Sequence, residues 1–305
     1  TGGMNAGGYP ISSNNTPDQQ LPAQSNAGMS DVPPLPPEMI RQLPNSSLVR
    51  VGADPLPELA SVPDLVRDDF RTFLEQVCEN LNNGQVLPMY EVLCRWYSDP
   101  KLTVAERRLL TKVLDQVTAE VIYSPRNYLE PSIYVVQPGE SLDMIAARYN
   151  VPWELLGKIN AVTDPRSISQ GEEIKVVTGP FSAVVDLSEK QIVMLLGNNK
   201  YYAGRFSIGA AYDQVDKGGA YLVSEKVRNP TFCGVDGTQI PPESPENPLA
   251  GFWIGLGVEG VGLHATNVPE DIGSSNAPGC VCLTPEDMGD LFDMLLVKSD
   301  SGVGS

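Results

Sequence analysis

The sequence contains a single histidine, only five cysteines and few basic residues for its 305 residues. The chain has 21 Lys and Arg against 38 Asp and Glu, and its net charge of −17 argues against a nucleic-acid or anionic-lipid partner, because such partners bind clustered cations. It lacks a run of about 18 uncharged apolar residues, which a membrane helix needs, and it shows no secretory signal pattern. We therefore expect no nucleic-acid partner and no membrane insertion by this chain, and an anchor preceding Thr1 stays an open alternative.

The cysteines follow neither a metal-ligand spacing nor a disulfide-dense pattern, so we expect no metal and no cofactor. Cys78 and Cys94 lie on apolar helical faces and are interpreted as small hydrophobic residues. Cys280 and Cys282 are separated by one residue, and a ring closed across so short a segment is strained. We therefore favour Cys282 as a buried filler over a Cys280–Cys282 bridge.

Composition divides the first 130 residues into two parts. Residues 1–60 are rich in Pro, Gly, Asn and Ser and have few core-forming residues, which predicts a disordered tether. Residues 61–130 show apolar positions at helical spacing, with an N-cap expected near Ser61, a second helix from about 88 to 97, and a third beginning at the capping box Thr103–Glu106. This part is predicted to be a small all-α segment without catalytic residues.

Residues 132–178 have a different pattern. A short strand at "YVV" is followed by a Pro-Gly turn, helices at about 141–149 and 152–160, a loop, and a closing strand at 173–177. The predicted order is strand, helix, helix, strand, which is an α+β unit.

This stretch resembles a LysM module in its Tyr-Val-Val opening, its Pro-Gly-Glu-Ser-Leu turn and the Gly-Glu before its last strand. The resemblance implies that it binds glycans containing N-acetylglucosamine. Carried over by position, the glycan-binding residues would be Gly139, Glu140, Ser141, Asn160 and Ile168. Gly, Ser and Asn are also the residues that a turn and a helix cap require, so a purely structural role is the alternative.

Residues 180–299 alternate apolar and polar positions from Phe181 onward, with a hairpin turn at "GNN", 197–199. A helix capped by Thr284, with Pro285 in its first position, is expected to close the domain. The prediction is a mostly β domain, so the whole chain is multidomain.

The chemistry of this last domain depends on His264 and Cys280. His264 is the only histidine, and a neighbouring imidazole can take the proton of a cysteine thiol. A lone Cys and a lone His in a β domain are more often packing residues, so the pair alone is weak support for catalysis.

The segments "VVDLSEKQIVML", "IPPESPENPLAGFWIGL", "GLHATNVPEDIG" and "GCVCL" resemble the catalytic domain of L,D-transpeptidases, the YkuD domain. The resemblance implies that Cys280 is the nucleophile that attacks a tetrapeptide stem of peptidoglycan and that His264 is the base. Gly279 would offer a backbone N–H to the oxyanion, while Thr266 and Asn267 would fix the loop. It also implies a location in the cell envelope, in the periplasm or cell wall.

Three positions of the cysteine motif depart from that family, which places a serine, a second histidine and an arginine where this sequence has Ala277, Pro278 and Cys282. Proline has no N–H to donate, and cysteine replaces neither the charge nor the donors of arginine. Three readings therefore remain: a cell-wall cross-linking L,D-transpeptidase, which we favour; a weakened or inactive peptidoglycan-binding scaffold protein; and an L,D-carboxypeptidase, in which water replaces the acceptor amine.

Overall fold

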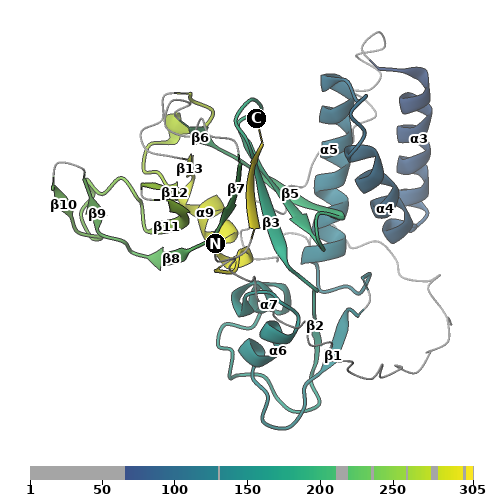
Figure 1. Ribbon diagram of the computed structural model, residues 1–305. Helices are drawn as coiled ribbons and strands as arrows, with labels where there is room; N and C mark the ends of the chain where they lie inside the picture. The colour runs from purple at the N-terminus through teal and green to yellow at the C-terminus, as the bar shows by residue number, and fades with distance from the viewer. Residues whose placement is uncertain are drawn as a thin grey trace, which may run out of the picture. The chain divides into compact units, whose positions relative to one another are not determined.

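The computed structural model describes residues 66–129, 131–210, 219–234, 237–258, 260–275, 281–297 and 300–304, the last of these by its backbone alone (Figure 1). The expected tether at 1–60 and the expected N-cap at Ser61 lie outside the described residues, as do Cys280, Gly279 and Pro278. Within the described part, no helix is both long and apolar enough to cross a membrane.

The all-α segment consists of α3 (Asp68–Asn82), α4 (Val86–Tyr97) and α5 (Val104–Thr118), which continues into one π-helical turn, Ala119–Tyr123. These helices bury one apolar face each, with Phe70, Leu93 and Leu114 fully enclosed. The first helix begins at Asp68, with Arg67 in the N-cap position, so the start expected near Ser61 was wrong. Asp68 and Asp69 occupy its first turn, where the helix dipole favours negative charge.

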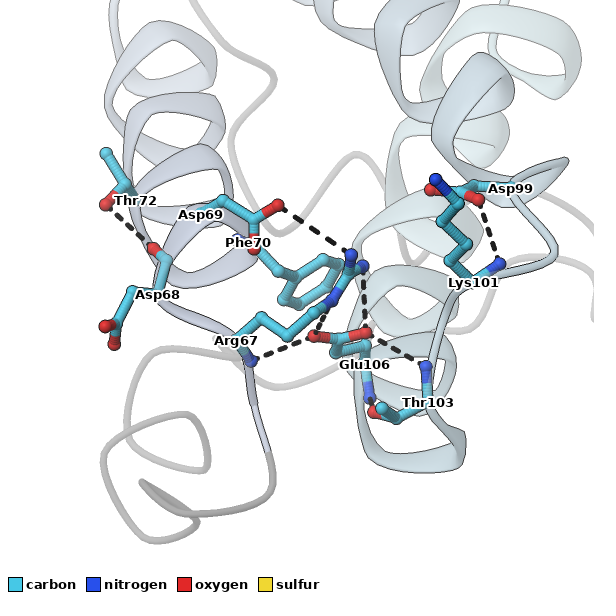
Figure 2. Close-up of polar contacts among 9 residues, drawn as sticks. All are labelled: Arg67, Asp68, Asp69, Phe70, Thr72, Asp99, Lys101, Thr103 and Glu106. Carbon is cyan, nitrogen blue, oxygen red and sulfur yellow. Dashed lines mark hydrogen bonds and ion pairs between the residues drawn. The ribbon is translucent and has the colours of Figure 1, made fainter.

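Glu106 connects the start of α3 to the start of α5 (Figure 2). The predicted capping box is confirmed: Thr103 Oγ1 accepts from Glu106 N at 3.2 Å, and Glu106 Oε2 accepts from Thr103 N at 2.9 Å. The backbone N–H and Nε of Arg67 both donate to Glu106 Oε1 at 2.9 Å. Burial would raise the pKa of Glu106, but the hydrogen bonds from Arg67 and Thr103 outweigh it, and the pKa is lowered.

Replacing Glu106 with glutamine is expected to destabilise the protein by about 2–4 kcal/mol, because an amide nitrogen would face buried donors that now share a carboxylate. Urea unfolding of the two proteins measures the difference. Glu75→Gln, at an exposed position of α3, is the matched control and should stay within about 0.5 kcal/mol of the unsubstituted protein. Equal unfolding midpoints for Glu106→Gln and Glu75→Gln would contradict the assignment.

The next unit contains β1 (Ile133–Val135), α6 (Leu142–Arg148), α7 (Trp153–Asn160) and β2 (Glu173–Lys175). The two strands pair antiparallel, with Tyr134 opposite Ile174. Leu142, Ile145 and Leu156 are fully buried between the helices and the strands. The order strand, helix, helix, strand predicted from the sequence is confirmed.

Among the described residues, the last part of the chain forms two five-stranded sheets and a separate two-stranded ribbon. The first sheet has the order β5 (Tyr201–Ser207), β4 (Gln191–Leu196), β3 (Phe181–Asp186), β14 (Asp300–Gly304) and β7 (Gly219–Leu222). The second sheet has the order β6 (Gly209–Ala210), β13 (Val281–Leu283), β12 (Val261–Ala265), β11 (Phe252–Val258) and β8 (Glu225–Arg228). The ribbon pairs β9 (Phe232–Cys233) with β10 (Gln239–Ile240). The domain is mostly β, as predicted.

Two local predictions for this domain have different outcomes. The helix α9 (Pro285–Met294) is capped by Thr284, whose Oγ1 accepts from Asp287 N at 3.1 Å, as expected. It does not close the domain, because β14 follows it and runs parallel to β3 (Figure 1). The sequence of β14, "DSGVG", has no apolar alternation, so its pairing is set by the neighbouring strands β3 and β7.

The all-α segment covers β5, which is an edge strand of the first sheet. Tyr90 Oη donates to the Tyr202 carbonyl and Tyr123 Oη to the Ala203 carbonyl, both at 2.6 Å. Tyr202 N donates to Cys94 Sγ at 3.4 Å. Unpaired backbone groups at a sheet edge invite pairing with another chain, and helical side chains satisfy them here.

Two lysines of the βααβ unit contact the parts of the chain on either side of it. Lys175 is 4% exposed, and its Nζ donates to the carbonyls of Val121, at 2.8 Å, and Ser124, at 2.6 Å. Lys158 Nζ forms ion pairs with Asp290 at 2.9 Å and Asp293 at 2.6 Å, both on α9. The three folded parts are therefore joined by contacts as well as by the chain.

Candidate active site

One face of the second sheet packs against α9, and the opposite face, called the polar face below, carries His264. Alternate residues of a strand point to opposite sides. Lys226 and Phe252 both contact the Phe292 ring of α9, and Ile254, which shares their face, is fully buried. The opposite face carries the residues in the alternate positions: Glu225, Val227, Trp253, Gly255, Gly262, His264 and Cys282. The polar face is where reactive groups can meet a ligand.

His264 lies on β12, between Trp253 of β11 and Cys282 of β13. Its side chain is buried, and its Nδ1 is 2.8 Å from the Ala265 carbonyl oxygen. A carbonyl only accepts hydrogen bonds, so Nδ1 carries the proton in the neutral ring and Nε2 is the basic nitrogen. Nε2 has no hydrogen-bond partner among the described residues.

The pKa of His264 is lowered because burial disfavours the imidazolium. The Ala265 carbonyl, the Asp271 carboxylate and the Pro248 carbonyl oppose that effect without cancelling it. The ring is therefore neutral near pH 7 and can accept a proton, which is what a general base requires.

Polar side chains hold the loops around His264. Thr266 Oγ1 donates to Asp271 Oδ2 at 2.9 Å and accepts from Val268 N at 3.1 Å. Asn267 Nδ2 donates to the Asn247 carbonyl at 3.1 Å. Asn247 is itself buried and donates through Nδ2 to the Pro230 carbonyl at 2.9 Å. The sequence analysis did not single out Asn247, and only its position before a proline in a turn-rich stretch could have suggested it.

Cys282 is the register partner of His264 on β13. It is a buried free thiol, and burial raises its pKa to about 11. Gly209 leaves room for it, because a Cβ at Gly209 would lie 2.9 Å from Cys282 Sγ. A thiol with so high a pKa is protonated at neutral pH and unreactive, which agrees with Cys282 as a filler. The roles of Cys280 and Gly279, outside the described residues, stay predictions.

Two of the predicted glycan-binding residues are engaged inside the βααβ unit. Glu140 accepts from Gln137 N at 2.9 Å and from Tyr134 Oη at 2.7 Å, and it pairs with Arg148 at 2.6 Å. These three contacts lower the pKa of Glu140 to about 2. Asn160 brackets the backbone of Lys175, donating to its carbonyl at 2.8 Å and accepting from its N–H at 2.7 Å. Glu140 and Asn160 therefore hold the unit together.

The other three predicted glycan-binding residues make fewer contacts that stabilise the βααβ unit. Gly139 has φ +78°, which only glycine adopts easily, and the space beside it is open. Ser141 precedes α6, but its hydroxyl does not cap the helix. Ile168 is half-buried in the loop between α7 and β2. A hydrogen bond from Leu142 N to the Pro165 carbonyl joins this loop to the start of α6. Glycan binding by these residues stays a prediction.

Comparison with known proteins assigns a domain family to the βααβ unit and to the β-sheet domain. Residues 180–302 match the family model of the L,D-transpeptidase catalytic domain, YkuD, and residues 134–177 match that of the LysM domain. The chain therefore contains a YkuD-type L,D-transpeptidase catalytic domain preceded by a LysM domain, as the sequence motifs indicated.

Several named proteins are similar to this chain. A Bacillus subtilis protein named as the L,D-transpeptidase YkuD is 22% identical over 168 residues, which span 53% of this chain and 92% of that protein. A second, named as the L,D-transpeptidase YqjB, is 27% identical over 120 residues, 37% of this chain and 65% of its own. A solved L,D-transpeptidase from Mycobacterium smegmatis is 17% identical, with a TM-score of 0.34, over 45% of this chain and 65% of its own. This chain thus covers slightly less than two thirds of that solved chain.

Proposed function

We propose that this protein is a peptidoglycan L,D-transpeptidase in the cell envelope, with Cys280 as nucleophile, His264 as base and the LysM domain binding the glycan strand. The observation that carries the proposal is the buried neutral His264. Its Nδ1 is held by the Ala265 carbonyl, and its Nε2 has no partner among the described residues. An ordinary packing histidine would have both ring nitrogens satisfied.

The reaction has two acyl-transfer steps. In the first, the Cys280 thiol gives its proton to His264, and the sulfur forms a bond to the carbonyl carbon of the third residue of a tetrapeptide stem. The bond from that carbon to the terminal D-alanine nitrogen breaks, and His264 returns the proton to the leaving amine. In the second, a neutral amine of a neighbouring stem attacks the thioester. A carbon–nitrogen bond forms, the carbon–sulfur bond breaks, and the proton lost by nitrogen passes through His264 to the thiolate.

Cys282 supports a second candidate function, an inactive peptidoglycan-binding protein. It is buried and protonated where the family resemblance places an arginine, so this position supplies neither charge nor a fork of donors. The expected consequence is a weaker electrostatic site. If water replaces the acceptor amine in the second step, the same site would act as an L,D-carboxypeptidase.

A carbapenem, whose reactive carbonyl traps nucleophilic cysteines, separates these candidates. Intact mass after incubation should show one adduct that disappears in Cys280→Ser. Cys233→Ser is the matched control, because Cys233 is an exposed free thiol and its loss should leave the adduct in place. Absence of any adduct, together with retained sedimentation with purified peptidoglycan sacculi, would leave the binding protein. Incubation with tetrapeptide stems then distinguishes the enzymes, since dimers indicate transfer and trimmed monomers indicate hydrolysis.

A further inference from the structure

On the polar face of the second sheet, two side chains cover a pair of neighbouring glycines. Gly255 of β11 and Gly262 of β12 are register partners, so two neighbouring positions of the sheet carry no side chain. A Cβ at Gly262 would lie 2.5 Å from Cη2 of Trp253, and a Cβ at Gly255 would lie 2.8 Å from Cγ of Glu225. The Trp253 indole and the Glu225 side chain therefore lie directly against the backbone of the sheet.

Trp253 and Glu225 form one unit above these glycines. The indole Nε1 donates to Glu225 Oε1 at 3.1 Å, which fixes the carboxylate at the edge of the ring. Glu225 is exposed and Trp253 is half-buried, so both reach the surface of the protein. The second carboxylate oxygen, Oε2, has no donor among the described residues. An aromatic face beside an unpaired carboxylate is the arrangement that binds an alkylammonium ion, through cation–π attraction and a charge-assisted hydrogen bond.

The position of this pair relates it to His264. Trp253 is the register partner of His264, and neighbouring strands lie about 4.8 Å apart. The indole itself lies over Gly262, two residues before His264 on β12, so a group bound on the indole lies on the same face as the imidazole and about 7 Å from it along the strand direction. Folding alone does not require the carboxylate, because an apolar side chain could cover Gly255 equally well.

We propose that Trp253 and Glu225 form the subsite for the primary ammonium group of the acceptor in the second acyl-transfer step. This inference rests on the proposed function. The subsite collects the acceptor in its protonated form on the face of the sheet that carries His264. The ammonium gives one proton to solvent water, and the neutral amine then attacks the thioester as in the second step above. Glu225 and Trp253 would act on the acceptor and have no part in attack on the donor stem.

The test separates the two steps of the reaction. With a tetrapeptide stem as donor and Nα-acetyl-lysine amide as acceptor probe, Glu225→Gln is expected to raise the acceptor KM about tenfold or more, the usual size of a lost contact to a charged group. Trp253→Leu should raise it by a similar factor. Acylation by the carbapenem should change less than twofold in both variants. Glu189→Gln, an exposed position in the turn between β3 and β4, is the matched control and should leave the acceptor KM unchanged.

Other outcomes would overturn the inference. An unchanged acceptor KM in Glu225→Gln excludes an ammonium subsite, and loss of sacculus binding in Trp253→Leu alone would indicate a platform for sugar rings instead. An equal loss of carbapenem acylation in both variants would show a general effect on the site. If no acylation occurs at all, the proposed function fails separately, and quenching of tryptophan fluorescence by Nα-acetyl-lysine amide still tests the subsite. That quenching should be present in Glu189→Gln and lost in Glu225→Gln.

Discussion

Replacing His264 with asparagine is expected to slow acylation by a carbapenem about 10²–10⁴-fold, the usual loss when a general base is removed. The imidazole is the only histidine side chain of the chain, and its Nε2 is basic because Nδ1 donates to the Ala265 carbonyl. Stopped-flow measurement of adduct formation gives the rate, and a thermal unfolding curve close to that of the unsubstituted protein shows that the fold is retained. An unchanged rate would remove His264 from the mechanism.

The same residue predicts a pH profile. Burial lowers the pKa of His264 below its usual 6.5, so the neutral imidazole predominates at pH 7. The acylation rate should therefore stay level as the pH falls from 7.5 to about 6.5 and decline only at lower pH, where the ring gains a proton. A decline that begins at about pH 7.5 would mean that the imidazolium is more stable than the buried site allows.

Replacing Lys175 with methionine is expected to change the pH dependence of stability. Burial lowers the pKa of Lys175 from 10.5 to about 7 in the folded protein, although the charge of Glu120 acts in the opposite direction. Between these two values the unfolded chain holds a proton that the folded chain lacks, so the free energy of unfolding rises with pH across the window. At about 1.4 kcal/mol for each pKa unit, the total rise across the window is on the order of 5 kcal/mol.

Urea unfolding at intervals from pH 6 to pH 10 measures this rise. In Lys175→Met the contribution is absent, so the difference between the two curves should grow steadily with pH above about 7. Lys101→Met, at an exposed position, is the control and should follow the unsubstituted protein. Parallel curves for Lys175→Met and the unsubstituted protein would show that the carbonyls of Val121 and Ser124 stabilise the ammonium enough to keep an ordinary pKa.

Local patterns predicted most helices and their caps, because a capping box or a Thr-Pro pair acts within four residues. The start of α3 was missed because it depends on a contact between Arg67 and Glu106, which are 39 residues apart. The strand β14 was missed for a similar reason, since its place between β3 and β7 comes from the sheet and not from its own sequence.

In the candidate site, too, the sequence predicted single residues but not the contacts that depend on strand pairing. His264 could be predicted because it is unique in the chain. The pairing of Trp253 with Glu225 could not, because it depends on the register of β8, β11 and β12 and on the two glycines beneath the side chains. Glu140 and Asn160 were predicted to bind glycan by position, from the LysM resemblance, and their contacts show that Glu140 also closes a turn and Asn160 brackets a strand.

The tyrosines that cover β5 change how the chain divides into folding units. Tyr90 and Tyr123 precede the LysM domain in sequence, yet their hydroxyls complete the hydrogen bonding of a strand that follows it. The helical segment therefore contributes to the catalytic sheets from the far side of the LysM domain in the sequence. A fragment that begins at residue 180, where the family match begins, would lose the tyrosines that cover its edge strand β5. The part of the chain that matches the family is therefore smaller than the part needed to protect its sheet.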